Sequence, residues 1–222
     1  RQKLRTAQRV AARDPFFAGN VDALIAAQPK DLEASEIEVR LGATWLDKKY
    51  IEQFMYETFE TPRYLRGQIE ISYVPYTAEW QVSRKSMVRY NDVAAFTTYG
   101  TDRASAYRLL EDALNLRDIR IYDTIEDADG RERRVLNAKE TTLAAQKQQL
   151  IRDAFKDWIW KDPERRETLV RQYNEEMNST RPREYDGSHI VFSGMNPEIT
   201  LREHQKNAIA HVLYGGNTLL AH

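Results

Sequence analysis

Two long segments of helical periodicity constrain the fold of this chain more than any other feature of its sequence. Within residues 138–178, apolar side chains recur at the three- and four-residue spacing of one helix face. The apolar residues of the first segment are Leu143, Leu150, Ile151, Ala154, Phe155, Trp158 and Ile159. Asp162-Pro163 predicts the start of a second helix, with Asp as N-cap and Pro in its first turn. That second helix is lined by Leu169, Val170, Tyr173 and Met177. We therefore predict a helical hairpin, which packs on a sheet or serves as an arm between domains.

Two parts of residues 31–137 have the alternating apolar and polar pattern of β-strands. Ile69, Ile71 and Tyr73 alternate with polar residues, which is typical of a strand with one buried face. Trp80 and Val82 predict the returning strand of a hairpin. Residues 117–125 and 131–136 predict a second hairpin around Asp129-Gly130, a favourable turn dipeptide, and residues 93–98 are a further strand candidate. The sequence thus predicts an α+β domain with a small, antiparallel sheet.

Helices are expected to flank this sheet. A short helix from Leu32 and a turn at Gly42 are followed by a helix that Asp47 caps. The apolar stripe of that helix is Tyr50, Ile51, Phe54 and Phe59. A further helix is predicted over residues 104–114, after Thr101-Asp102, with Tyr107, Leu110, Ala113 and Leu114 turned inward. We expect these stripes to form core rather than a ligand pocket.

The N-terminal 1–30 segment is predicted to be helical and basic. Its basic residues are Arg1, Lys3, Arg5, Arg9 and Arg13, and Asp14-Pro15 interrupts the helix before it resumes at Val21. A solvated surface explains such a face more simply than contact with DNA. The Pro- and Gly-containing residues 179–200 predict a linker.

Composition limits the classes of function. The chain has 222 residues, 33 of them basic and 34 acidic, so any contact with DNA must come from a local patch. The absence of Cys excludes disulfides and thiolate metal sites, and it fits a cytoplasmic protein. No apolar run approaches membrane-spanning length. The four His residues show no metal-ligand spacing, and no catalytic constellation is predicted.

Residues 201–222 predict a helix, a turn and a strand. Thr200 is a plausible N-cap, and Leu201, Ala208, Ile209, Val212 and Leu213 recur near helical spacing. Gly215-Gly216 ends the helix, and residues 217–221 predict a short buried strand.

Several short stretches resemble one family of very large bacterial proteins, in which an adenine-specific DNA methyltransferase is joined to a SNF2-type helicase. These stretches are Val39-Arg40-Leu41-Gly42-Ala43-Thr44-Trp45, Tyr99-Gly100-Thr101, Leu110-Glu111-Asp112-Ala113-Leu114-Asn115, Tyr173-Asn174-Glu175, Tyr185-Asp186-Gly187-Ser188, Gly194-Met195-Asn196-Pro197 and Leu201-Arg202-Glu203-His204-Gln205. The resemblance spans most of the chain, from about Leu32 onward. Members of that family are often carried on phages and conjugative elements.

The resemblance implies that residues 201–222 begin the first RecA-like lobe of the motor. Gln205 is then the residue that contacts the adenine of ATP, and the strand over 217–221 feeds a phosphate-binding loop that holds Mg²⁺ through a Ser or Thr. We expect that loop after His222, and the methyltransferase with its S-adenosylmethionine upstream. The chain would be a segment connecting the two, which by itself has no catalysis and no measurable affinity for ATP.

Two basic clusters are the candidate DNA-binding residues. The first contains Arg84, Lys85, Arg89 and Tyr90, with Tyr90 available for stacking on a base, and the second contains Arg131, Arg133 and Arg134. They predict an accessory region that helps the helicase–methyltransferase engage or position DNA. The alternatives are a purely structural spacer between methyltransferase and motor, and a protein-interaction module; both lack DNA contact.

Overall fold

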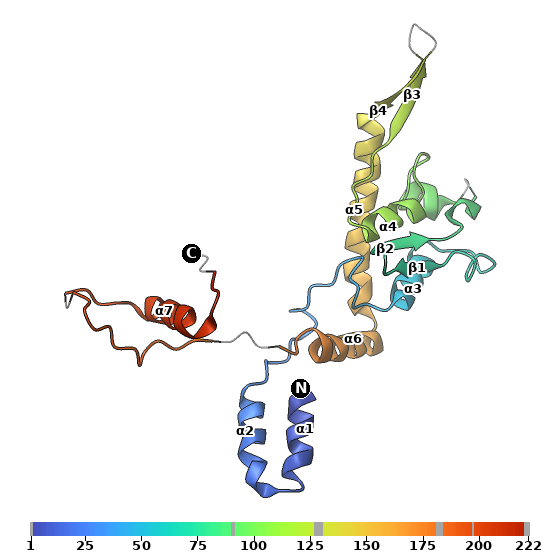
Figure 1. The fold of residues 1–222 in the computed structure, drawn as a ribbon. Helices are drawn as coiled ribbons and strands as arrows, with labels where there is room; N and C mark the ends of the chain where they lie inside the picture. Colours follow the sequence, from blue (N-terminus) through green and yellow to red (C-terminus); the bar gives the residue numbers. More distant parts are fainter. Residues whose placement is uncertain (1, 90–91, 127–130, 181–183, 197, 220–222) are drawn as a thin grey trace. The chain divides into compact units, whose positions relative to one another are not determined.

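The structure is a computed structural model that describes residues 2–89, 92–126, 131–180, 184–196 and 198–219 (Figure 1). The chain divides into two compact units. Unit 1 combines residues 1–30 with residues 178–222, and unit 2 is formed by residues 31–177. The predicted regions 31–137 and 138–178 thus both lie in unit 2, apart from the last residue of the second region.

The described residues of unit 1 form the α-helices α1 (Gln2–Ala11), α2 (Ala18–Ala26) and α7 (Glu203–Gly215), with a 3-10 turn over Pro15–Phe17. The Asp14 side chain accepts a hydrogen bond from the Phe16 backbone N–H at 3.0 Å, so the break predicted at Asp14-Pro15 is confirmed as a capped turn. Neither α1 nor α2 contains a buried residue. The described basic residues of α1 are exposed, as a solvated face would be.

A loop of residues 184–190 lies along α7. The Tyr185 ring stacks on His211 with centroids 4.5 Å apart, and the Gly187 N–H donates to Asn207 Oδ1 at 2.8 Å. A Cβ on Gly187 would come within 2.0 Å of the Lys206 carbonyl oxygen, so only glycine allows this approach. The loop therefore covers part of α7, in which Ala210 is buried.

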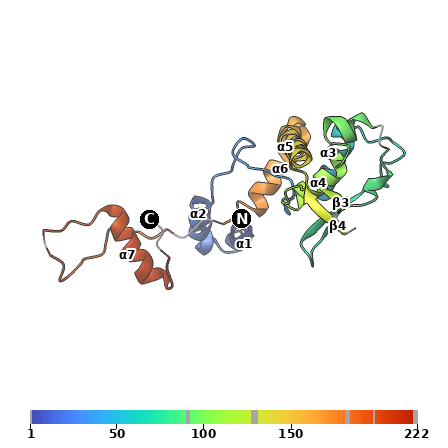
Figure 2. The same cartoon turned by 90° about the horizontal axis from the view of Figure 1, so that it is seen from above.

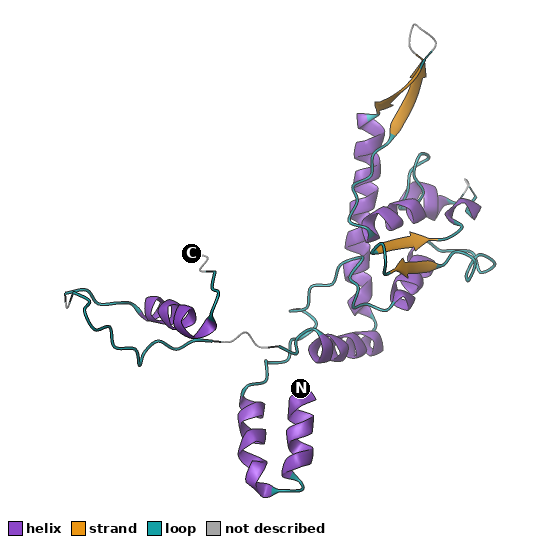
Figure 3. Cartoon of the chain, viewed as in Figure 1, coloured by secondary structure: helices purple, strands orange, loops and turns teal. Residues whose placement is uncertain are grey.

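Unit 2 is mixed α and β, and its described residues form two antiparallel hairpins and several α-helices (Figure 3). The helices are α3 (Lys48–Thr58), α4 (Ala106–Leu114), α5 (Ala138–Lys161) and α6 (Pro163–Glu176). The first hairpin pairs β1 (Ile71–Val74) with β2 (Glu79–Val82), and the second pairs β3 (Tyr122–Glu126) with β4 (Glu132–Leu136). Short helical turns occupy Lys85–Met87 and Ala94–Thr98. The α+β class and the antiparallel pairing are confirmed, but the two hairpins form two separate sheets rather than the one small sheet predicted. The two helices predicted over residues 138–178 are present as α5 and α6.

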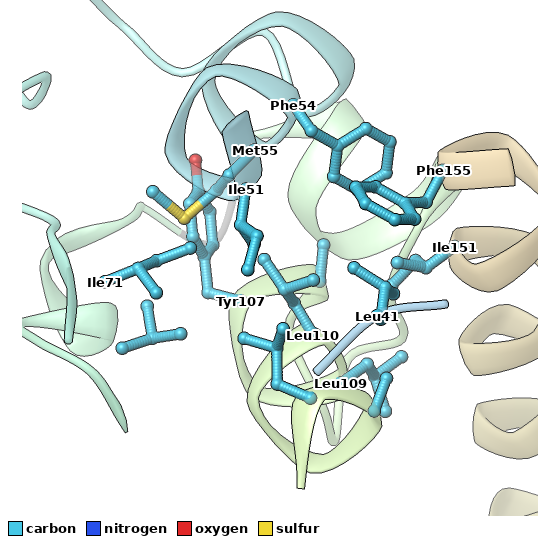
Figure 4. Close-up of a cluster of buried hydrophobic side chains, with 14 of the residues drawn as sticks. Leu41, Ile51, Phe54, Met55, Ile71, Tyr107, Leu109, Leu110, Ile151 and Phe155 are labelled. Carbon is cyan, nitrogen blue, oxygen red and sulfur yellow. The ribbon is translucent and has the colours of Figure 1, made fainter. Parts of the chain in front are cut away.

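The core of unit 2 forms where α3 and α4 meet α5. Figure 2 looks nearly along α5 and shows α3 and α4 on the same side of it. Figure 4 shows Phe54 of α3 against Phe155 of α5, with Leu109 and Leu110 of α4 beside Ile151. The rings of Phe54 and Phe155 meet edge to face at 5.1 Å. The buried side chains come from all three helices, so the helices depend on one another for stability.

Side chains of the flanking helices form hydrogen bonds with backbone groups along the edges of the β1–β2 hairpin. At the end of α4, Asn115 accepts from the Trp80 N–H and donates to the Trp80 carbonyl, both at 2.8 Å. Glu111, one turn earlier, accepts from the Val82 N–H at 2.8 Å. On α3, Glu52 accepts from the Ile71 N–H at 2.9 Å. A two-stranded hairpin is marginal by itself, and these bonds satisfy backbone groups that further strands would otherwise pair.

Two buried amides hold extended backbone in the same way. Asn174 of α6 accepts from the Leu32 N–H and donates to the Leu32 carbonyl, both at 2.8 Å. Gln148 of α5 donates to the Arg117 carbonyl at 2.9 Å. Because its polar groups are occupied by Asn174, Leu32 does not begin a helix, and the prediction of a helix there is wrong.

The strand predicted over residues 93–98 is also wrong, since Ala94–Thr98 forms a π-helical turn. Asp92 accepts from the Ala95 N–H at 3.0 Å and so starts the turn. Lys147 of α5 donates to the carbonyls of Thr97 and Thr98 at 2.7 and 3.0 Å and so ends it. These local bonds outweigh the β propensity of the threonines.

Other differences concern helix faces and ends. Leu143, Leu150 and Met177 are 40%, 43% and 51% exposed, against the prediction. In α5 the buried face follows residues 144, 148, 151, 155 and 159 instead, and Met177 lies beyond the last residue of α6, as its C-cap. The helix predicted from Ala104 begins at Ala106, after Thr101 and Ala104 form an isolated bridge. Arg202 rather than Thr200 is the N-cap of α7. Residues 217–219 form no strand, and the remainder of the strand predicted over 217–221 lies outside the described residues.

Candidate nucleic-acid interface

The β3–β4 hairpin projects beyond the N-terminal end of α5 (Figure 1). We call it the arm. Every residue of β4 is exposed, and so are Thr124, Ile125 and Glu126 of β3. The arm therefore contributes little to the core, and its side chains are available to a partner. The predicted turn at Asp129-Gly130 lies outside the described residues.

The arm carries the second predicted basic cluster. Arg131 precedes β4, and Arg133 and Arg134 lie within it, all three exposed. The register places Arg133 opposite Ile125 and Arg134 opposite Thr124. Because consecutive residues of a strand point to opposite faces, the two guanidinium groups emerge on the two faces of the arm.

Aromatic and apolar side chains accompany these cations. The Arg134 guanidinium lies 4.8 Å from the centre of the Tyr122 ring, at cation–π distance. Ile125 and Leu136 are each 48% exposed. Acidic residues are present as well, since Glu126 pairs with Glu132 in the register. The local charge of the described part of the arm is thus mixed, with the cations concentrated on and before β4.

Hydrogen bonds around Asp123 fix the base of the arm. Arg103 Nη1 donates to Asp123 Oδ1 at 2.8 Å, and Arg103 Nη2 donates to the Tyr122 carbonyl at 2.9 Å. Asn137 Nδ2 donates to Asp123 Oδ2 at 2.7 Å, while Asn137 Oδ1 caps α5 by accepting from the Glu140 N–H. The bonds from Arg103 and then Asn137 lower the pKa of the Asp123 carboxyl. The hairpin pattern predicted the arm, but it did not reveal Arg103 and Asn137 as its anchors.

The first predicted basic cluster lies elsewhere in unit 2, after β2. Arg84 and Arg89 are exposed, and Arg84 adopts a left-handed backbone conformation with φ of 47°. Lys85 forms an ion pair with Glu111 of α4, which also holds the edge of β2. Lys85 is therefore already paired within the fold, which leaves Arg84 and Arg89 as the exposed cations among the described residues of this cluster. Tyr90 lies outside the described residues.

The structure does not place the two basic clusters together. The cluster around Lys85 is held next to α4, whereas the cluster around Arg133 lies on the arm, and Figure 1 shows these segments apart. A single short contact with DNA would therefore involve one cluster and not both. The arm is the better candidate, because its cations extend from the fold on a projecting element.

Gln205 lies in the first turn of α7, in unit 1. Its side chain is exposed, and its Oε1 accepts from the Arg202 backbone N–H at 2.9 Å. This bond satisfies one backbone donor at the start of the helix. Gln205 thus has a local structural role in addition to the one that the family resemblance implies.

Several residues that carry the family resemblance prove to be structural contacts of unit 2. Gly42 has φ of +84°, and a Cβ there would lie 2.1 Å from the Leu114 carbonyl oxygen. A Cβ on Gly100 would lie 2.0 Å from the Ala95 carbonyl oxygen. Asn115 and Asn174 hold the backbone of Trp80 and Leu32. These stretches therefore identify a fold more directly than a chemical activity.

The described part of the chain shows neither a metal-binding cluster nor a membrane-spanning helix. Among those residues, no group of three or more His, Cys, Asp or Glu side chains is placed to hold a metal ion. None of the helices within the described ranges combines the length and apolarity that crossing a membrane requires.

Residues 40–179 match a protein family described as Domain of unknown function (DUF8437). The matched region includes all the described helices and strands of unit 2. Comparisons with curated proteins and with solved structures give no significant match. Because the family match covers more than half of the 222 residues, the chain belongs to the DUF8437 family.

Proposed function

We propose that this chain is a non-catalytic accessory region of a cytoplasmic SNF2-type DNA helicase fused to an N6-adenine DNA methyltransferase, and that it helps the enzyme engage DNA. The contact is made by the arm, through the phosphate backbone. The observation that carries the proposal is the projecting β4 strand, on which Arg133 and Arg134 are exposed on opposite faces. Arginines in this setting bind phosphates without reading base sequence.

The geometry of the arm supports phosphate contact in two ways. A two-stranded ribbon is narrow enough to enter a DNA groove, so cations on both of its faces can reach phosphates on either side. The Tyr122 ring beneath Arg134 limits the freedom of that guanidinium, which lowers the entropic cost of holding it on a phosphate. Glu126 and Glu132, near the far end of the arm, repel phosphates, so the attraction of the arginines must outweigh this repulsion.

ATP, Mg²⁺ and S-adenosylmethionine belong to this proposal only through the other parts of the fusion protein. Gln205 fits an adenine contact in one respect, since its side chain is exposed at the start of α7. Its Oε1 accepts one hydrogen bond from the Arg202 N–H, and because an amide oxygen can accept two, both the oxygen and the amide nitrogen could contact adenine. When bound, ATP would supply the free energy for movement along DNA.

The proposal is tested by fluorescence anisotropy, titrating the whole chain into labelled duplex and single-stranded DNA over a range of salt concentrations. If Arg131, Arg133 and Arg134 each contact one phosphate, a plot of log affinity against log salt concentration for duplex DNA would have a slope of about −3. Binding that weakens along such a line supports the proposal. No salt-dependent binding to either form of DNA would rule it out.

A structural spacer between methyltransferase and motor is the second candidate function. It is favoured by the finding that Gly42, Asn115 and Asn174 hold the fold together, and that Lys85 is paired within the fold. A spacer needs rigidity but no ligand. It therefore predicts that reversing the charge of the arm leaves the DNA affinity of the full fusion protein unchanged.

A further inference from the structure

Trp158 of α5 is held in a fixed orientation at the surface of unit 2. Its indole Nε1–H donates to Glu57 Oε2 of α3 at 2.7 Å. The guanidinium carbon of Arg165 lies 3.6 Å from the centre of the indole ring. Arg165 is itself buried, and it donates to the carbonyls of Ile159 and Trp158 at 3.0 and 2.6 Å. The indole is therefore oriented before any partner arrives.

Trp158 lines two hollows, and Arg165 lines only one of them. The hollow that contains Arg165 has a volume of about 400 Å³. The other, of about 370 Å³, is lined by residues that include Glu57, Tyr99, Ala154, Asp157, Trp158 and Lys161. We call the second one the Trp158 hollow. It combines two aromatic rings with two carboxylates, which is the chemistry that attracts a cation.

The charges around the Trp158 hollow also favour a cation. Among the described residues that line it, Glu57 and Asp157 are opposed by Lys161. The Arg165 guanidinium over the same indole offsets the charge of Glu57, so the exposed Asp157 is the carboxylate that a further cation would meet. The hollow lies at the C-terminal end of α3, which finishes at Thr58 with no basic residue in its last turn. The partial negative charge of that helix end adds to the two carboxylates.

We infer that the Trp158 hollow binds the guanidinium group of an arginine from a basic segment of a partner protein. The fold itself shows that this indole accepts a guanidinium, since Arg165 already stacks on it. A second guanidinium would pack on the aromatic rings and donate to Asp157, which is exposed. None of the arm's arginines lines this hollow, so arginine binding there does not depend on contact between the arm and DNA.

A nucleobase fits the hollow less well than an arginine. Stacking on Trp158 would suit a base, but its attached phosphates would face Glu57 and Asp157, and like charges repel. Lys161 offers one compensating cation. The two carboxylates therefore favour a cationic side chain and oppose a nucleotide.

The test uses the whole chain labelled with ¹⁵N, and it follows the indole N–H signals of its four tryptophans. The probe is acetyl-Gly-Arg-Gly-amide, and its matched control contains citrulline, which is neutral but nearly the same shape as arginine. The arginine peptide should shift the Trp158 indole signal saturably, with a dissociation constant on the order of millimolar, whereas the citrulline peptide should not. The Trp158 signal is assigned from its loss in Trp158→Phe.

Three variants at exposed positions sharpen this test. Asp157→Asn removes a carboxylate and should weaken binding of the arginine peptide about threefold, while Lys161→Gln removes the competing cation and should strengthen it. Asp153→Asn, on the same helix but outside the hollow, should leave binding unchanged. The inference would be overturned by equal shifts of the Trp158 indole signal with both peptides, or by no shift with the arginine peptide well above millimolar concentration. A shift with adenosine but not with the arginine peptide would also overturn it.

Discussion

At the scale of single residues, this fold depends on a few positions that hold two distant backbone segments close together. Gly42 lets the chain approach the last turn of α4. Asn174 forms the hydrogen bonds with the Leu32 backbone that a neighbouring strand would otherwise form. A substitution at such a position removes more than its own contacts, because it separates two segments or leaves buried polar groups unpaired. These residues explain why short stretches resemble a family without revealing its chemistry.

Gly42→Ala should destabilise unit 2 by about 3 kcal/mol, because the new methyl group meets the Leu114 carbonyl oxygen and the backbone also has positive φ. Gly67→Ala is a matched control. Gly67 has nearly the same φ, +82°, with nothing within 4 Å of the added methyl group, so only about 1 kcal/mol should be lost. Urea unfolding followed by circular dichroism measures both. Equal losses would show that the close approach to Leu114 does not matter.

At the scale of elements, the arm is attached to the rest of unit 2 through polar contacts at its base. Asp123 accepts from Arg103 and Asn137, and Asn137 also caps α5. The arm thus begins and ends at one junction, which sets its direction relative to the helix. Its exposed strands leave that direction dependent on a few hydrogen bonds.

The pKa of the Asp123 carboxyl provides a test of this junction. Since Arg103 and Asn137 lower that pKa, the junction stabilises the arm at neutral pH, and the stabilisation is lost as pH falls from the ordinary range of an Asp carboxyl through the lowered value. Arg103→Gln should return the pKa upward, toward its ordinary value. NMR titration of the Asp123 carboxyl measures it in both proteins, and an unchanged titration would contradict the role given to Arg103 in the junction.

The sequence predicted the elements that are set by local pattern. Both hairpins, the Asp47 cap and the Asp162-Pro163 helix start follow from neighbouring residues, and all are present. The errors arose where distant residues decide the structure. Asn174 keeps Leu32 extended, and Lys147 ends the π-helical turn at Thr98. Likewise, the basic pattern located Lys85 but not Glu111, its partner on α4.

At the scale of the whole molecule, the two units differ in how much they bury. Unit 2 contains nearly all of the buried apolar side chains among the described residues, including Tyr107, Phe54 and Phe155, whereas α1 and α2 bury none and α7 buries only Ala210. Helices of this length are marginal in water without such packing. Stability is therefore expected to be uneven along the chain.

Native-state hydrogen exchange should reveal this difference. Backbone amides of α4 and of the buried face of α5 should exchange only on global unfolding of unit 2, and those of α1, α2 and α7 should exchange orders of magnitude faster. Mass spectrometry of peptides from the whole chain resolves the two groups. Comparable protection in α1 and α4 would contradict the expectation.

The proposal that the arm engages DNA is tested most directly by charge reversal. Arg133→Glu/Arg134→Glu on the arm is compared with Arg166→Glu/Arg171→Glu, which changes two exposed arginines of α6 by the same charge. In anisotropy titrations against duplex DNA, the arm variant should bind about tenfold or more weakly, with a salt slope reduced by about 2, and the α6 variant should bind within about twofold of the wild type. If the two variants bind DNA equally well, the arm does not engage DNA, and the two functions without DNA contact, a structural spacer and a protein-interaction module, are the ones that remain.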